Sequence, residues 1–393
     1  MAAAAGCAAA AAAPKLWADR FCEELMNVLL VAGARPNFMK IAPIYRASLD
    51  FSSVRCSIVH TGQHYDREMS GTFFEELEIP KPRYSLNAGS GSHAAQTAAI
   101  MVAFEEVCTK EKPDLVLVVG DVNSTLACSI VAKKCGVDVA HVEAGLRSFD
   151  LAMPEEINRM VTDAISDHFF VTEESAVDNL LREGKPARRI HAVGHVMVDN
   201  LLHQVERLSR QDVTLLKGYR LKEKAHPYLF LTLHRPSNVD CRATFAGIAK
   251  ALNQLAQSRT IFFPVHPRTR KMMEEHGLTL SEKVVLMPPL GYRDALFIWK
   301  DAEAVLTDSG GLQEETTALG VPCVTIRENT ERPITVEIGS NVLAGTSPDR
   351  IVAGLAESLA KKGTARVPPL WDGRASERIW KVLAGAPPPE IAP

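Results

Sequence analysis

Three acidic residues stand at the ends of successive apolar or helical segments. Asp121 follows the apolar run 115–119, Glu143 follows the run 137–142, and Glu155 opens a helical pattern. Short apolar runs that alternate with helical segments are typical of βα units in a parallel sheet. Ligands bind such sheets beyond the carboxyl ends of the strands. We therefore expect all three acids to face one crevice.

Carboxylates gathered in this way indicate proton chemistry. They raise one another's pKa, and titratable groups with altered pKa values concentrate at functional sites. A structural interpretation stays open for single residues: Asp121 could cap a helix over 122–135, and Glu155 could simply favour a helix start. The coincidence of three acids favours an acid–base site.

Two glycine-containing turns are predicted to bind anions. The first, Gly33–Pro36, lies between a strand over 27–32 and a helix over 37–49. Backbone N–H groups at a helix start attract anions, and Arg35 and Lys40 would add positive charge. Arg35 could instead pair with a neighbouring carboxylate, and Lys40 could be a solvated helix residue.

The second turn is Ser309-Gly310-Gly311, between a strand over 304–307 and a helix. Its glycines would let backbone N–H groups approach a phosphate, and Glu315 could reach a ribose diol. The alternative is an ordinary βα turn in which glycine allows tight packing.

The pattern predicts an α/β protein with two Rossmann-like domains that face a central cleft. The 393 residues exceed what one core holds comfortably. A long amphipathic helix from about Met197 to Arg210 interrupts the βα rhythm, so we place the boundary there. The predicted parts are an Ala-rich extension (1–25), an N-terminal domain (26–196), a C-terminal domain (197–372), and a final helix with a proline-rich tail (373–393).

Composition excludes several classes of protein. The net charge of −3 argues against a nucleic-acid binder, and the sequence has no apolar stretch of about 20 residues that could cross a membrane. The eight cysteines form no CxxC pair, which fits a reducing, cytoplasmic compartment. His60, His64 and His141 lack metal-ligand spacing, so no metal is predicted.

Eight motifs together resemble the non-hydrolysing UDP-N-acetylglucosamine 2-epimerase family. In chain order they are GARPNFMKIAP, TGQHYDREMS, VVGDVNSTLA, HVEAGLRSFD, MPEEINR, LTLHRPSN, LTDSGGLQEE and TERP. The resemblance implies a glycosyltransferase-B-like architecture, with nucleotide in the interdomain cleft and a C-terminal helix that crosses back to the first domain.

The resemblance also implies a reaction and site residues. UDP-GlcNAc would become UDP-ManNAc through elimination of UDP, formation of 2-acetamidoglucal and re-addition of UDP, without a cofactor. By motif position the catalytic residues would be Asp121, Glu143, Glu155, His234 and Lys40. Substrate would be bound by Arg35, Lys40, Arg147, Arg159, His234, Ser309, Gly310, Gly311, Glu315 and Arg332.

Some positions depart from the family pattern. Many members have Thr and Glu where this chain has Ala34 and Asn37. Ala295 stands where members often place a ring against uracil, and Phe297 could substitute for it. In bacterial members UDP-GlcNAc also activates from a neighbouring site, for which Gln63 and His266 occupy plausible positions.

Several alternatives remain open at this point. The substrate could be another UDP-HexNAc, the enzyme could be of the hydrolysing type, or the fold could serve a glycosyltransferase. A catalytically silent nucleotide-sugar sensor would keep Arg35, Ser309 and Glu315 but lose the acids. A homodimer is an expectation from the resemblance.

Overall fold

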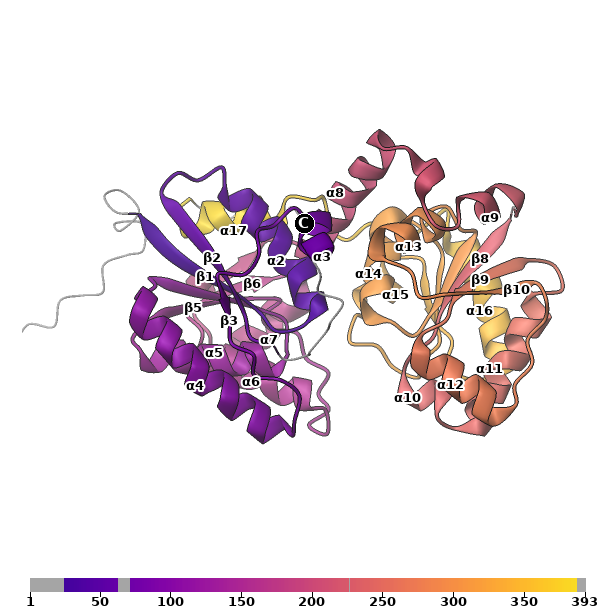
Figure 1. Cartoon of the computed structure of the whole chain (residues 1–393), viewed down its shortest axis with the longest axis horizontal. Coiled ribbons are helices and arrows are strands. Elements are labelled where there is room, and N and C mark those ends of the chain that lie inside the picture. The colour runs from indigo at the N-terminus through magenta and orange to yellow at the C-terminus, as the bar shows by residue number, and fades with distance from the viewer. Residues whose placement is uncertain (1–24, 63–70, 226, 387–393) are drawn as a thin grey trace, which may run out of the picture.

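The computed structural model describes residues 25–62, 71–225 and 227–386, which form two lobes joined near one end (Figure 1). The predicted Ala-rich extension and the proline-rich tail beyond residue 386 lie outside the described residues, as does Gln63.

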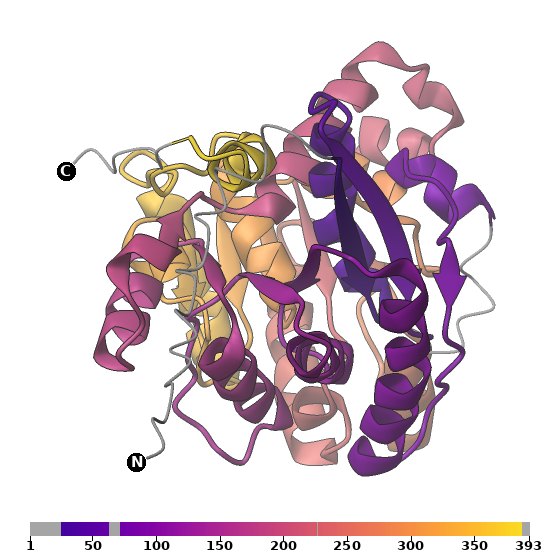
Figure 2. The ribbon, with the colours of Figure 1, turned by 90° about the vertical axis from the view of Figure 1, so that its left-hand side faces the viewer.

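The N-terminal lobe is built on a parallel sheet, which has seven strands within the described ranges, in the order β3-β2-β1-β4-β5-β6-β7. All five residues of β4 are buried, as expected where helices cover both faces of a parallel sheet. In Figure 2 this lobe is turned toward the viewer. The strands are β1 (Met26–Ala32), β2 (Val54–His60), β3 (Tyr84–Ser85), β4 (Leu115–Val119), β5 (Asp138–Val142), β6 (His168–Val171) and β7 (Ile190–Ala192).

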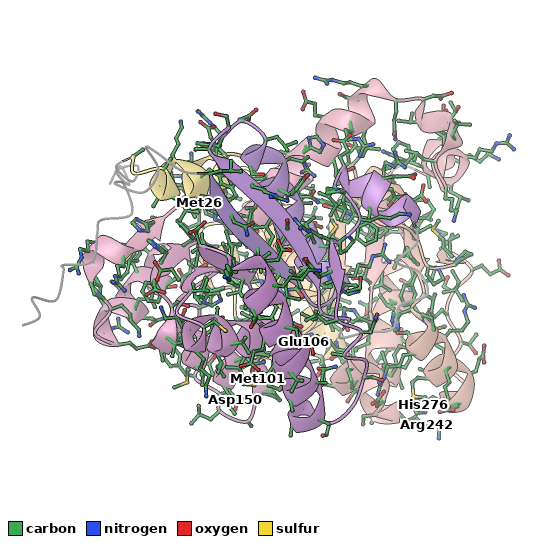
Figure 3. All side chains as sticks on the ribbon, turned by 60° about the vertical axis from the view of Figure 1, so that its left-hand side comes forward. Met26, Met101, Glu106, Asp150, Arg242 and His276 are labelled. Carbon is green, nitrogen blue, oxygen red and sulfur yellow. The ribbon has the colours of Figure 1, made fainter. Side chains whose placement is uncertain are left out.

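Helices alternate with these strands. They are α2 (Arg35–Ser48), α3 (Gly71–Leu77), α4 (His93–Glu111), α5 (Asn123–Lys134), α6 (Pro154–Ile165), α7 (Glu174–Arg182) and the 3-10 helix η1 (Ala187–Arg189). Helix α5 packs between α4 and α6, so the three form a layer on one face of the sheet. Figure 3 shows the outer side of this layer, with Met101 and Glu106 labelled on α4.

The C-terminal lobe repeats this plan around a second parallel sheet, whose order over the described residues is β10-β9-β8-β11-β12-β13. Its strands are β8 (Tyr228–Thr232), β9 (Thr260–Pro264), β10 (Val284–Met287), β11 (Ala304–Thr307), β12 (Cys323–Thr325) and β13 (Asn341–Leu343). Its helices are η2 (Val213–Leu215), α9 (Tyr219–Lys224), α10 (Pro236–Val239), α11 (Arg242–Leu255), α12 (Pro267–His276), α13 (Tyr292–Trp299), α14 (Gly310–Leu319), α15 (Ile334–Glu337) and α16 (Pro348–Lys361).

Strand order reverses at one point in each sheet. The chain winds outward from β1 to β3 on one side and from β4 to β7 on the other, and β8 and β11 occupy the same relation in the second sheet. A crevice opens beyond the strand ends at such a switch point. The segments that follow β1, β4, β8 and β11 are the places where a ligand site is expected.

Two helices tie the lobes together. Helix α8 (Val196–Arg210) leaves the first lobe and packs against α2 as well as against α13 and α14 of the second. Helix α17 (Ala375–Leu383) returns to the first lobe, where Trp380 is fully buried and its Nε1 donates to the carbonyl of Ile44 at 2.8 Å. Among the residues described, no helix is long and apolar enough to cross a membrane.

Replacing Trp380 with alanine should weaken the first lobe. The change removes a buried indole from a core that also contains Ile379 and Leu383, and such truncations cost about 3–5 kcal/mol of unfolding free energy. Urea unfolding followed by circular dichroism measures the loss. Lys381→Ala, on the exposed side of the same helix, is the control and should change the transition by less than about 0.5 kcal/mol. Equal effects of the two changes would contradict the docking role of α17.

Candidate active site

Lys40 and Glu143 form a close ion pair at the first switch point. Lys40 comes from α2 after β1, Glu143 follows β5, and their Nζ and Oε2 atoms are 2.5 Å apart. Gly120, at the end of β4, has a φ of +66°, and an added Cβ would lie 2.9 Å from Nζ of Lys40. Glycine is therefore required there both by the backbone and by the close approach of the lysine.

Glu143 is held in an unfavourable conformation. Its φ is +69°, in the left-handed region that residues with a side chain seldom occupy. Its carboxylate is buried, and within the described part of the chain its Oε1 has no hydrogen-bond partner. A strained, partly unsatisfied buried carboxylate is typical of a functional group, because structure alone would not maintain it.

Asp121 lies beside this pair and binds Arg159 of α6 through its Oδ2 atom. It does not cap α5, because the N-cap residue is Val122. The turn that carries it is fixed by His141, whose Nε2 donates to the carbonyl of Gly120 at 2.9 Å. The capping interpretation of Asp121 is therefore wrong, and its carboxylate pairs with Arg159 instead.

Glu155 and its neighbour Glu156 have different positions. Both lie in the first turn of α6, but Glu156 is the buried one and accepts hydrogen bonds from the backbone N–H groups of Ser148 and Phe149 and from Arg159. Burial alone would raise the pKa of Glu156, but these donors lower it below its ordinary value. Glu156 holds the loop at Ser148 and Phe149 in place. Glu155 is half-buried in the same first turn of α6, and the catalytic role of Glu155 stays a prediction.

At the second switch point Asp308 positions His234. The buried carboxylate of Asp308 accepts the backbone N–H groups of His234 and Arg235, and its Oδ1 lies 3.0 Å from Nδ1 of the His234 ring. Burial raises the pKa of Asp308, and the bonds from His234 outweigh this and lower it. The exposed His234 ring thus faces the cleft from a fixed backbone.

The glycine turn at the start of α14 lies against Arg332. A Cβ added to Gly310 would be 2.9 Å from Nη1 of Arg332, so glycine leaves room for the guanidinium. Nothing lies within 4 Å of the equivalent position on Gly311, which leaves that side of the turn open. The predicted phosphate-binding turn therefore combines the start of a ten-residue helix with a half-buried cation.

Arg332 connects the two switch points. Its Nε lies 2.7 Å from Oε1 of Glu314, and its Nη1 lies 2.8 Å from Oε1 of Glu331. Burial lowers the pKa of a guanidinium, but Glu314 and Glu331, with smaller contributions from Glu143 and Asp121, outweigh it and raise the pKa of Arg332. The acids of the first lobe and the glycine turn of the second therefore share one electrostatic environment.

A cavity of about 500 Å³ extends from this turn between the lobes. Predicted site residues in its wall are Arg35, His234, Ser309, Gly311 and Glu315, and Met39, Met197, Pro289, Leu290, Tyr292, Ala295 and His266 also line it. One part is apolar and the other carries cations and the helix start. Such a cavity fits an amphiphilic ligand with an anionic group, such as a nucleotide.

Glu315 lies buried at the wall of this cavity. Tyr292 donates a hydrogen bond of 2.7 Å to its Oε1. Desolvation raises the pKa of Glu315 to about 7, despite the opposing bond from Tyr292. Phe297, which the sequence offered as a substitute ring, packs against Tyr219 and Lys222 and is not part of the cavity wall. Tyr292 lines the wall together with Ala295.

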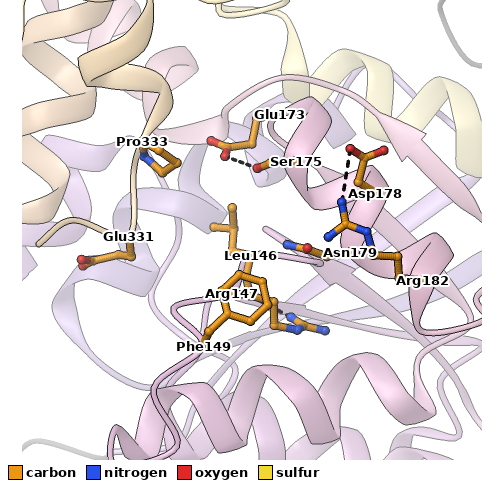
Figure 4. A pocket seen from close by; sticks show the side chains of 10 residues that line it. All are labelled: Leu146, Arg147, Phe149, Glu173, Ser175, Asp178, Asn179, Arg182, Glu331 and Pro333. Carbon is orange, nitrogen blue, oxygen red and sulfur yellow. Dashed lines mark hydrogen bonds and ion pairs between the residues drawn. The ribbon is translucent and has the colours of Figure 1, made fainter.

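Arg147 lies apart from the acid cluster. Its guanidinium is 2.7 Å from both Asp163 and Glu183 and is almost fully buried. It borders a smaller pocket of about 230 Å³ between the lobes, which Glu173 and Glu331 also line (Figure 4). Its contacts hold the loop after β5, and substrate binding by Arg147 stays a prediction.

A family model described as UDP-N-acetylglucosamine 2-epimerase matches residues 48–384. The chain belongs to this family. The resemblance seen in the eight motifs is confirmed. The glycosyltransferase-B-like α/β fold is also confirmed, because both parallel sheets agree with those of solved UDP-GlcNAc 2-epimerases.

Relatives across the family match nearly the whole chain. The UDP-N-acetylglucosamine 2-epimerase of Methanocaldococcus jannaschii is 42% identical over 364 residues, which are 91% of this chain and 99% of the relative. The UDP-2,3-diacetamido-2,3-dideoxy-D-glucuronate 2-epimerase of Pseudomonas aeruginosa is 41% identical over 362 residues, with the same coverage.

Solved epimerase structures show the same architecture. The M. jannaschii epimerase in complex with UDP-GlcNAc and UDP superposes with a TM-score of 0.82 at 41% identity and covers 92% of this chain and 100% of its own. The Neisseria meningitidis epimerase bound to UDP-GlcNAc has a TM-score of 0.80 at 29% identity, with the same coverage.

Sequence reasoning missed three contributors to the epimerase cleft: Asp308, Glu314 and His195. Asp308 directly precedes the predicted glycine turn, and a buried acid at a strand end could have been noted. Glu314 and His195 are 119 positions apart by numbering, yet Nε2 of His195 lies 2.9 Å from Oε1 of Glu314. No local spacing could have signalled that pair.

Glu315→Gln should stabilise the epimerase more at high pH than at low pH. The folded protein binds a proton at Glu315 up to about pH 7, whereas the unfolded chain releases it near 4.5, so wild-type stability falls as pH rises across this window. Glutamine does not titrate, so the variant does not lose stability in this way as the pH rises. Its advantage in urea unfolding should grow between pH 5 and pH 8 by about 1–3 kcal/mol.

The control is Glu282→Gln, an exposed acid of the same lobe, which should show no such growth. An advantage of Glu315→Gln that is the same at both pH values would contradict the proton held at Glu315.

Proposed function

We propose that the protein interconverts UDP-GlcNAc and UDP-ManNAc as a non-hydrolysing 2-epimerase, and that the cleft residues described above carry the reaction. The observation that carries the proposal is the position of Arg332, which lies on the glycine turn of one lobe and within the field of Asp121 and Glu143 of the other. A sugar diphosphate that spans the lobes would have its phosphates at the turn and its C2 near the acids.

The reaction breaks two bonds on adjacent carbons of the sugar, C2–H and C1–O. A carboxylate takes the C2 proton while the C1–O bond breaks, the electron pair leaves with the diphosphate oxygen, and 2-acetamidoglucal and UDP result. Re-addition of UDP with a proton delivered to the opposite face of C2 gives the epimer. The C2 proton is very weakly acidic, so removal must be coupled to departure of UDP.

The proposed residue roles follow from this chemistry. Arg332, Lys40 and His234 would absorb negative charge that develops on the departing diphosphate, with Arg35, Ser309, Gly310 and Gly311 as further phosphate contacts. Asp121, Glu143 and Glu155 would transfer protons, because inversion requires groups on both faces of the sugar. Arg147 and Arg159 would bind substrate, and Glu315 would hold the ribose hydroxyls. Which acid removes the proton stays open.

A second candidate substrate is a UDP-HexNAc carrying a carboxylate. The P. aeruginosa relative acts, by its name, on such a uronate, and its 41% identity barely differs from the 42% of the M. jannaschii enzyme. We favour UDP-GlcNAc because two of the solved neighbours contain it. Overall similarity does not discriminate between these substrates.

Wild-type protein incubated with UDP-GlcNAc in D₂O should incorporate deuterium at C2, detected by NMR, and release no stoichiometric free UDP. Parallel incubation with a UDP-HexNAc uronate tests the second substrate. Asp121→Asn and Glu143→Gln should lower turnover about 10²-fold or more while UDP affinity by calorimetry stays within a few-fold.

Glu357→Gln, an exposed acid-to-amide change on α16, is the matched control and should be fully active. Absence of C2 exchange in the wild type would overturn the function. Loss of UDP affinity in the two acid variants, with unchanged turnover of bound substrate, would overturn their proton-transfer role.

We also propose that the protein is a homodimer in a reducing, cytoplasmic compartment. Support for the compartment is the set of free, buried thiols at Cys108, Cys128 and Cys323. Support for the dimer is the outer side of the α4–α5–α6 layer, where Val102, Ile157 and Met160 are 67%, 49% and 42% exposed. Large apolar side chains that gather on one exposed helix layer favour an interface with another protein surface.

Met160→Glu combined with Val102→Glu should therefore convert the dimer to a monomer. Two buried, unpaired carboxylates on each side would cost more than a modest interface supplies. Light scattering after size-exclusion chromatography measures the mass. Leu215→Glu alters an equally apolar residue that is 84% exposed in η2, away from the layer, and should leave the mass unchanged. A monomeric wild type would contradict the proposal.

A further inference from the structure

His195 lies at the junction between the lobes and makes contacts in two directions. It is the N-cap residue of α8, and its Nδ1 accepts the backbone N–H of Met197 at 3.1 Å. A nitrogen that accepts cannot carry the proton of a neutral ring, so Nε2 carries it. Nε2 lies 2.9 Å from Oε1 of Glu314, a close polar contact outside the geometry of a hydrogen bond.

The surroundings of His195 fix the ring. Its side chain is 2% exposed, and the edge of the ring meets Trp371 with centroids 5.1 Å apart. The Nε1 of Trp371 in turn donates to the carbonyl of Thr172. The ring contact with Trp371 and the bond from Met197 therefore hold the ring with Nε2 on the side of Glu314.

Glu314 passes this constraint to Arg332. The same Oε1 that faces His195 lies 2.7 Å from Nε of Arg332. Arg332 in turn fills the space left by Gly310. Burial raises the pKa of Glu314, but Arg332 and His195 lower it to about 2, so the carboxylate between them is charged. The series therefore runs from the start of α8 to the predicted phosphate-binding turn.

We infer that His195 is a positioning residue for the epimerase: its Nε2, in close contact with Oε1 of Glu314, keeps that carboxylate against the guanidinium of Arg332 where the diphosphate docks. This inference rests on the proposed function for the identity of the ligand. Without the donor, the buried carboxylate would keep one fewer partner and could rotate, and Arg332 would rotate with it. The phosphate would then meet a cation that is present but misdirected, which weakens binding and transition-state stabilisation.

A merely structural role predicts something different. Capping of α8 uses Nδ1, whereas positioning of Glu314 uses Nε2, and these two functions can be separated by substitution. In His195→Asn the side-chain oxygen can take the place of Nδ1 and cap the helix, but the side chain is too short to reach Glu314. In His195→Gln the amide nitrogen can take the place of Nε2 and donate to Glu314, while the cap is weakened.

The experiment measures three quantities for both variants: the melting temperature, the UDP dissociation constant by calorimetry, and kcat and KM for UDP-GlcNAc. We expect His195→Asn to melt near the wild-type temperature but to lose about 10-fold in UDP affinity and in kcat/KM. We expect His195→Gln to melt lower and yet stay within about 3-fold of wild type in both. The inference would be overturned if UDP affinity and kcat/KM followed the melting temperature instead, so that His195→Asn kept both and His195→Gln lost both.

A double-mutant cycle tests the route through Glu314. In a Glu314→Gln background, His195→Asn should cost less than 2-fold further UDP affinity, because the partner it acts through is already changed. Independent, additive losses would contradict the coupling. UDP binding needs no turnover, so a wild type without C2 exchange would refute the proposed epimerase function and leave this test of His195 intact.

Discussion

Charge balance in a buried cleft is the constraint on which the structure of this epimerase depends. Lys40 with Glu143 and Arg332 with Glu314 place opposite charges in direct contact where little water reaches them, and the more exposed Asp121 and Glu331 pair with Arg159 and Arg332. An unpaired charge there would cost several kcal/mol, so every side chain in the cleft limits the choices of its neighbours. Carboxylates of both lobes act on Arg332, so its positive charge is fully compensated only when the two lobes face each other.

The fold meets this constraint by placing the charged residues at strand ends. Parallel sheets expose their carboxyl ends at one edge, and the switch points after β1 and β4, and after β8 and β11, bring residues distant in sequence to one crevice. The buried strands supply rigidity without taking part in the chemistry. Helices α8 and α17 then fix the distance between the lobes: α8 packs on α2 of the first lobe and leads into the second, and α17 returns from the second lobe to the core of the first.

Much of this could be predicted from sequence because its signals are local. The apolar runs at 168–171, 260–264, 284–287 and 304–307 coincide with β6, β9, β10 and β11. The two-residue β3 and the three-residue β13 carry too little pattern to stand out from loops. The motifs identified the family, but adjacent residues such as Glu155 and Glu156 could not be distinguished, because the register of α6 against its loop decides which acid is buried.

The contacts that sequence could not indicate are those made across the cleft. Asn37 is another example: its Oδ1 accepts the N–H of Ala34, and its Nδ2 donates to the carbonyl of Val119. Asn37 therefore holds the start of α2 and ties it to β4. The local sequence can predict the bond between Asn37 and Ala34 at the helix start. It cannot predict the bond to Val119 on β4, because that residue is 82 positions away in the chain.

The need for several carboxylates sets a lower limit on how such a cleft can be built. Inversion at C2 requires a proton acceptor on one face of the sugar and a donor on the other, and both must lie near cations that stabilise the leaving diphosphate. Cations placed next to carboxylates would weaken those carboxylates as bases if each pair were isolated and permanent. The arrangement around Arg332 resolves this conflict, because one guanidinium is shared among several acids and the open side of the Gly311 turn leaves room for a phosphate to join them.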